Sequence, residues 1–141
     1  MLRIVLATDV LVSGVISPEG ASRQLLVDAL DRRFNLLLST SFLAEYESVL
    51  RRPQHLAKAR ASEIEIMEIL DALAGLCIPV VFDYRWRPTG AHPDDELIIE
   101  TAINGQANAV ATFNLKDMGE AGKHFGFTVQ RPGPLLRSMR S

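Results

Sequence analysis

The chain has 141 residues, the length of one domain, and 48% of them are hydrophobic and 23% charged. This balance supports a packed core and excludes a disordered tail. No stretch reaches the roughly 18 apolar residues of a membrane-spanning helix, and the apolar run at residues 2–6 is too short for a secretory leader. The single cysteine excludes an internal disulfide framework. We therefore expect one domain over residues 1–141, in a cytoplasmic protein with no membrane contact.

The formal net charge is -2, so the molecule as a whole does not attract nucleic acid strongly. Basic residues nevertheless form small clusters, such as Arg51 with Arg52, while acidic residues gather at 63–71 and 94–100. A polyanion could therefore meet a local basic rim, although most such clusters are simply solvated surface.

In the first half of the chain, short apolar runs alternate with helical patterns. They predict, in order, a strand at residues 2–6, a helix over 22–32, a strand at 35–38, a helix from an N-cap within 39–41 to about 52, a short helix near 54–60 and a helix over 62–75. Pro53 stops the second of these helices, and Ser62 with Glu65 has the pattern of a capping box.

The second half continues the alternation. It predicts a strand at residues 78–82, a helix from Pro93 to Gly105, strands at 107–112 and 127–129, and a last helical turn at 135–139. Alternating strands and helices predict an α/β fold, a three-layer α/β/α sandwich with a mostly parallel central sheet.

Ligands of such sheets bind beyond the carboxyl ends of the strands, and four acidic residues follow the predicted strands. Asp9 comes after the first strand, and Glu45 lies in the helix that follows the second. Asp95 begins the helix after the third strand, and Asp117 comes after the fourth. Carboxylates that converge raise one another's pKa and need a compensating charge. A magnesium or manganese ion, which prefers oxygen ligands, is the usual one.

Each acidic residue also has a purely structural interpretation. Asp9 could end a strand, Asp95 could complement a helix dipole and Asp117 could begin a short helix. Glu45 could be a surface residue, but its helical spacing with Phe42 places it partly on the apolar face. The metal site therefore depends on the convergence of all four.

The sequence resembles the PIN domain family, the nuclease fold of VapC-type toxins in toxin–antitoxin pairs, and in particular its branch of toxin components. The resemblance covers nearly the whole chain and rests on residues 4–13, 43–53, 92–96 and 112–117, the first and last being the more specific. It implies that Glu45, Asp95 and Asp117 are the catalytic, metal-binding acids. Beside them it places Asn114, with Thr8 or Ser13 as supporting hydroxyls.

Position 7 departs from this family. PIN domains usually begin Leu-Asp-Thr-Asn or Leu-Asp-Thr-Asp, and the first Asp is a principal metal ligand. Here that position is Ala7, whose methyl group has no lone pair. Asp9 would lie on the same side of a strand and recruit the cation through water, without reproducing the lost geometry. We favour a deliberate substitution, because an active toxin harms its host; natural loss of activity is the alternative.

The resemblance implies an Mg²⁺- or Mn²⁺-dependent endoribonuclease, the toxin of a type II toxin–antitoxin pair, impaired in this chain by Ala7. Its implied partners are an RNA substrate, a cognate antitoxin and a second copy of the chain. One alternative is a non-catalytic PIN-like module that binds an antitoxin or RNA, which Ala7 favours. A phosphohydrolase with an aspartyl nucleophile ranks last, because it also needs a carboxylate at position 7.

Overall fold

The computed structural model describes residues 1–81 and 93–140, except for the side chains at positions 93, 94 and 117. Its centre is a five-stranded sheet in the order β3-β2-β1-β4-β5, with every neighbouring pair parallel. The strands are β1 (Arg3–Leu6), β2 (Asn35–Leu38), β3 (Ile78–Pro79), β4 (Ala109–Ala111) and β5 (Thr128–Gln130). The predicted α/β/α class with a parallel sheet is confirmed.

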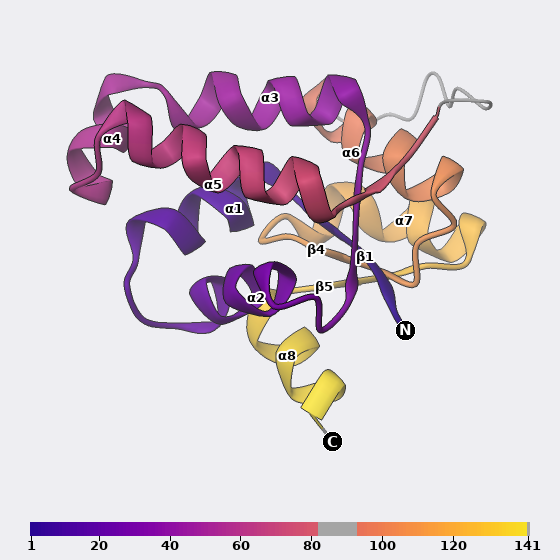
Figure 1. Cartoon of the computed structure of the whole chain (residues 1–141). Coiled ribbons are helices and arrows are strands. Elements are labelled where there is room, and N and C mark those ends of the chain that lie inside the picture. The colour runs from indigo at the N-terminus through magenta and orange to yellow at the C-terminus, as the bar shows by residue number, and fades with distance from the viewer. Residues whose placement is uncertain (82–92, 141) are drawn as a thin grey trace.

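Eight helices in the described ranges cover this sheet (Figure 1). They are α1 (Thr8–Ile16), α2 (Ala21–Leu30), α3 (Thr40–Leu50), α4 (Pro53–Ala59), α5 (Glu63–Leu76), α6 (Pro93–Asn104), α7 (Leu115–Phe125) and α8 (Pro132–Arg140). Helix α3 packs beside α5, α6 packs against β1 and β2, and α8 packs on α2. None of the helices in these ranges has both the length and the apolar character needed to cross a membrane.

Local sequence signals account for most of these elements. The apolar strands are the centre of the core, where Ile4, Leu36 and Val110 are fully buried. The side chain of Ser39 caps α3 by accepting a hydrogen bond from the N–H of Phe42. The predicted capping box at the start of α5 is present, with both of its reciprocal hydrogen bonds formed.

Four elements differ from the sequence expectation, one of them α8, which was predicted as a single turn at residues 135–139 but begins at Pro132. Helix α1, which is rich in β-branched residues, was not predicted, and α7, which contains two glycines, was considered only as a short helix that Asp117 could begin. Strand β3 was predicted over residues 78–82, but it ends at Pro79, which has no N–H to donate to a ladder. Phe82 lies outside the described residues.

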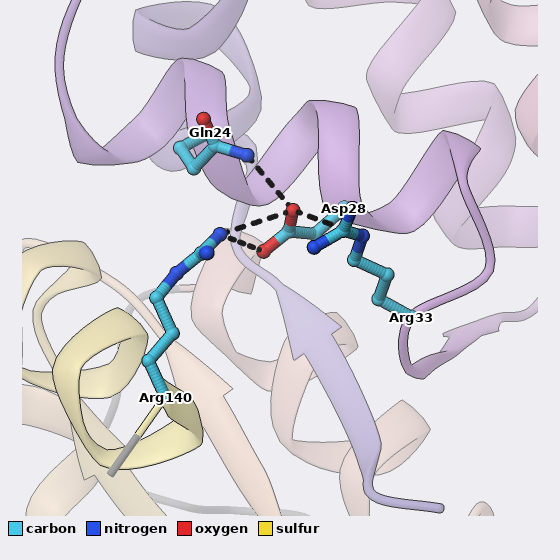
Figure 2. A network of polar contacts seen from close by, with 4 residues as sticks. All are labelled: Gln24, Asp28, Arg33 and Arg140. Carbon is cyan, nitrogen blue, oxygen red and sulfur yellow. Dashed lines mark hydrogen bonds and ion pairs between the residues drawn. The ribbon is translucent and has the colours of Figure 1, made fainter.

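The C-terminal helix is fastened to α2 by a buried carboxylate (Figure 2). Asp28, only 2% exposed, accepts hydrogen bonds from the Arg140 guanidinium at 2.9 and 3.3 Å and from the Gln24 amide at 2.9 Å. The Arg33 guanidinium lies 4.0 Å from the same carboxylate. A buried charge is stable only when it is paired in this way, so Arg140 links the end of the chain to the core.

Strand order determines where a ligand can approach. The chain builds β1, β2 and β3 in one direction and then returns to add β4 and β5 on the other side of β1. Leu6 is paired with Ala111, so the residues that follow β1 and β4 lie side by side. Open α/β sheets bind their ligands at such a reversal of strand order.

Candidate functional site

A pocket of about 400 Å³ opens at the carboxyl ends of β1 and β4. We call it the acidic pocket; it is lined by Ala7, Thr8, Asp9, Val12, Glu45, Val49, Arg52, His55, Asp95, Ile98, Thr112, Asn114 and Met118. Its walls therefore come from the ends of two strands and from five helices, α1, α3, α4, α6 and α7. Three of the four predicted carboxylates, Asp9, Glu45 and Asp95, face this pocket.

Ala7 lies where β1 passes into α1. Its N–H donates to the carbonyl of Ala111 at 2.9 Å, and its backbone is extended, as at a helix N-cap. The residue is 1% exposed, and its side chain makes no capping hydrogen bond. A methyl group therefore lines the pocket at the point where the resemblance implies a carboxylate.

Asp9 joins the two strand ends. Its Oδ2 accepts hydrogen bonds from the N–H of Phe113 at 3.1 Å and from the hydroxyl of Thr112 at 3.4 Å. The same hydroxyl oxygen accepts from the N–H of Asn114 at 3.0 Å. The expectation that Asp9 follows the two-residue period of a strand is wrong, because β1 ends at Leu6 and Asp9 lies in the first turn of α1.

Glu45 and Asp95 reach the pocket from opposite helices. Glu45 is partly buried on α3, in the same helix as the buried Phe42 and Val49, as its spacing predicted. Asp95 lies in the first turn of α6, and the amide Nδ2 of Asn114 donates to its Oδ2 at 3.5 Å.

Tyr46 fixes α3 against the sheet, a contact that the sequence did not predict. Its fully buried hydroxyl donates to the carbonyl of Leu6, the last residue of β1, and its ring packs on Phe42. Burial, reinforced by the nearby Cys77 thiol, raises the pKa of Tyr46 far above its ordinary value. The phenol therefore stays a hydrogen-bond donor and holds the turn of α3 that carries Glu45.

The other predicted residues are placed differently. Thr8 lines the acidic pocket. Ser13 instead lines a neighbouring pocket of about 320 Å³, together with Phe113 and Arg131. The side chain of Asp117, which lies in α7, is outside the described ones, so its role stays a prediction.

Arg52 and His55 line the pocket beside α3, and sequence reasoning assigned neither of them to it. Arg52 is the N-cap of α4, and His55 is partly buried with its Nδ1 2.7 Å from the carbonyl of Val49. A signal for Arg52 was available: Pro53 forces the preceding residue into an extended backbone, away from the course of α3.

The donor set fits a hydrated divalent cation. No group of three His, Cys, Asp or Glu side chains within the described part of the chain could hold a metal by itself. Magnesium, however, keeps several waters and binds proteins through one or two carboxylates. Glu45 and Asp95, at one pocket, provide oxygens of this kind, and a carboxylate at position 7 would add another.

Comparisons with known proteins identify the fold and the family. A family model described as PIN domain matches residues 3–116. No curated protein matches the chain. The crystal structure of VapBC2 from Rickettsia felis bound to a DNA fragment from their promoter includes a chain with a TM-score of 0.59 and 15% identity, covering 92% of this chain and 98% of that one. The crystal structure of FitAcB from Neisseria gonorrhoeae gives a TM-score of 0.55 and 21% identity, with the same 92% and 98% coverage. Two such likenesses support the fold, and the family match covers most of the sequence: the chain belongs to the PIN domain family.

Proposed function

We propose that this chain is the toxin of a type II toxin–antitoxin pair, a cytoplasmic endoribonuclease that uses Mg²⁺ or Mn²⁺ and whose activity Ala7 weakens. The observation that supports this most is the acidic pocket itself. In a PIN-domain chain, it gathers the carboxylates of Asp9, Glu45 and Asp95 at the reversal of strand order.

Each residue has a distinct part in the proposed reaction. Asp95 and Asp117 would hold the cation, and the Asn114 amide, which donates a hydrogen bond to Asp95, would orient that carboxylate. Glu45, on a helix fixed by the Tyr46 hydrogen bond, positions the attacking water. A bound cation lowers the pKa of water and stabilises charge on the phosphate and the leaving oxygen. No side chain acts as a nucleophile, so no covalent intermediate is required.

The proposed partners follow from the family. A cognate antitoxin would cover the acidic pocket, and the similarity in fold to a chain of VapBC2 is consistent with such a complex.

We also propose a homodimer formed through helices. Ile64, on the exposed face of α5, is 72% exposed, whereas Ile66, Leu70 and Leu73 of the same helix are buried in this chain's own core.

The Ala7→Asp variant tests the catalytic proposal. We expect it to bind Mn²⁺ in calorimetry and to cleave a set of labelled RNAs in Mg²⁺, while the parent chain is much slower. Asparagine has nearly the same size as aspartate but no charge, so the Ala7→Asn variant should stay inactive. Adding Glu45→Gln or Asp95→Asn to Ala7→Asp should abolish cleavage again. If Ala7→Asp binds no divalent cation and leaves diverse RNAs intact, the nuclease proposal is wrong.

Ala7 also favours a second candidate function, a PIN-like module that binds RNA or an antitoxin without cleavage. A buried methyl group at this point of the pocket is what we expect in a protein that no longer binds a cation there. Sequencing codon 7 of the natural gene distinguishes the nuclease from the binding module. An Asp codon means a deliberate substitution, and an Ala codon supports the binding module.

A further inference from the structure

The acidic pocket has a basic edge as well as acidic walls, and the two neighbouring arginines at the end of α3 are used differently. Arg51 forms ion pairs with Glu47, at 3.0 Å, and with Glu63 at the start of α5. Arg52 is exposed at the edge of the acidic pocket and takes part in none of the ion pairs among the residues that the structure describes. The charge of Arg51 is therefore neutralised within the protein. The charge of Arg52 lies at a pocket whose acidic side chains are negative.

The backbone explains why the two side chains diverge. Arg51 keeps a helical conformation at the C-cap of α3, with φ -83° and ψ -1°. Arg52 is extended, with φ -61° and ψ 134°, because a residue before proline avoids the helical region. Pro53 then begins α4. The turn thus sends Arg52 toward the pocket independently of any ligand.

His55 holds this turn closed. Its Nδ1 lies 2.7 Å from the carbonyl oxygen of Val49, and because a carbonyl can only accept, Nδ1 carries the proton. This hydrogen bond spans the residues between the last turn of α3 and the first turn of α4, with Arg52 in between. His55 therefore restrains the backbone of the turn from which the Arg52 side chain extends.

We propose that Arg52 binds a backbone phosphate of the RNA strand at the edge of the acidic pocket, and that His55 is the positioning residue for it. The inference rests on the proposed function, because it assigns a phosphate-binding residue to that same site. A strand crossing three carboxylates is repelled by them, and a guanidinium beside them supplies local attraction where the net charge of -2 supplies none. The contact carries no base information, so it positions RNA without selecting a sequence.

The test is the affinity of the parent chain for a fluorescein-labelled RNA octamer, measured by anisotropy between 25 and 200 mM salt, in EDTA and in Mg²⁺. We expect Arg52→Ala to weaken binding about tenfold at low salt. It should also reduce the slope of log affinity against log salt by about 0.7, the value for one contact to single-stranded nucleic acid. Arg51→Ala, which removes the same charge one residue earlier, should leave affinity and slope within error, and Arg52→Lys should keep the slope.

His55 needs a separate readout. His55→Ala should lower RNA affinity severalfold, and His55→Asn, whose amide N–H occupies a similar position on the side chain, should restore it. A combined Arg52→Ala and His55→Ala variant should bind no more weakly than Arg52→Ala alone. Once the Arg52 side chain is removed, His55 has no phosphate-binding group left to position.

The inference is overturned if Arg51→Ala and Arg52→Ala weaken binding equally, or if Arg52→Ala has no effect. It is also overturned if the parent chain binds no RNA at concentrations up to about 10⁻⁴ M, the weak end of non-specific binding. Loss of binding of an antitoxin peptide alone, with RNA binding intact, would assign Arg52 to a protein partner and overturn it too. The EDTA series measures binding without cleavage, so its outcome is independent of Ala7→Asp. If that variant cleaves RNA while Arg52→Ala binds normally, only this inference fails; the reverse pattern removes the nuclease proposal alone.

Discussion

Asp9 and Phe113 are 104 residues apart in sequence, yet the carboxylate of one accepts the backbone N–H of the other at 3.1 Å. This contact joins the first turn of α1 to the loop that leaves β4 and carries Asn114. Asp9 therefore shapes the acidic pocket whether or not it also meets a cation through water.

Two substitutions at Asp9 separate these roles. Asp9→Ala removes the acceptor and should lower the free energy of unfolding by about 1 kcal/mol, since the loop is exposed and water replaces part of the bond. Asp9→Asn keeps a side-chain oxygen that can accept from Phe113 and should stay within about 0.5 kcal/mol of the parent chain. Urea unfolding measures both.

Cation binding provides the control, measured for both changes in the Ala7→Asp background. If Asp9 positions the loop, Asp9→Asn retains most of the Mn²⁺ affinity and Asp9→Ala loses more. Equal loss in both variants would show instead that the charge of Asp9 is what the cation requires.

Arg140 is predicted to hold α8 in place. Arg140→Ala leaves the buried Asp28 with its Gln24 hydrogen bond and a distant Arg33, and should cost about 2 kcal/mol of stability. Arg137→Ala, an exposed arginine of the same helix, should change stability by less than about 0.5 kcal/mol. Thermal unfolding of the two variants compares them directly. Equal stabilities would mean that α8 is held by its apolar contacts alone.

The sequence predicted most of the fold because its signals are local. Apolar runs, the serine caps and the capping box at Ser62 need only neighbouring residues, and they were confirmed except at the end of β3. Helix α1 was missed because it begins two residues after β1 without a capping side chain, at Ala7. Its β-branched residues gave no clear helical pattern.

The site was predicted only in part for the same reason. Sheet topology alone indicated that acids after different strands would approach one pocket, and Asp9, Glu45 and Asp95 do line one. The hydrogen bond from Tyr46 to Leu6 joins residues 40 apart, which no local pattern encodes. The position of Arg52 at the pocket depends on the turn at Pro53. The position of His55 depends on its hydrogen bond to the carbonyl oxygen of Val49.

Stability should depend on pH through Tyr46. Burial raises its pKa in the folded protein, whereas in the unfolded chain it loses its proton near its ordinary value of about 10. Above that pH the unfolded state binds fewer protons than the folded one, so the free energy of unfolding falls, by at most about 1.4 kcal/mol per pH unit. The contribution is complete below pH 10 and is lost as the pH rises further.

Tyr46→Phe isolates this effect. The variant loses the hydrogen bond to Leu6 and should be about 1 kcal/mol less stable at pH 8. It has no phenol at position 46 to titrate, so the difference from the parent chain should shrink between pH 9 and 11. Urea midpoints at each pH provide the measurement, and a constant difference across that range would contradict the assignment.

Two glycines of α7, three residues apart, should respond oppositely to alanine. A Cβ at Gly122 would lie 2.6 Å from the carbonyl oxygen of Phe127 and 3.0 Å from a methyl of Val129, so the helix or β5 must shift. Gly122→Ala should therefore cost about 1–3 kcal/mol. A Cβ at Gly119 meets nothing within 4 Å, and alanine lowers the entropy of the unfolded chain, so Gly119→Ala should add about 0.5–1 kcal/mol. Both variants are compared by urea unfolding. Because helix propensity alone favours alanine at both positions, stabilisation by Gly122→Ala would mean that α7 does not pack this closely on β5.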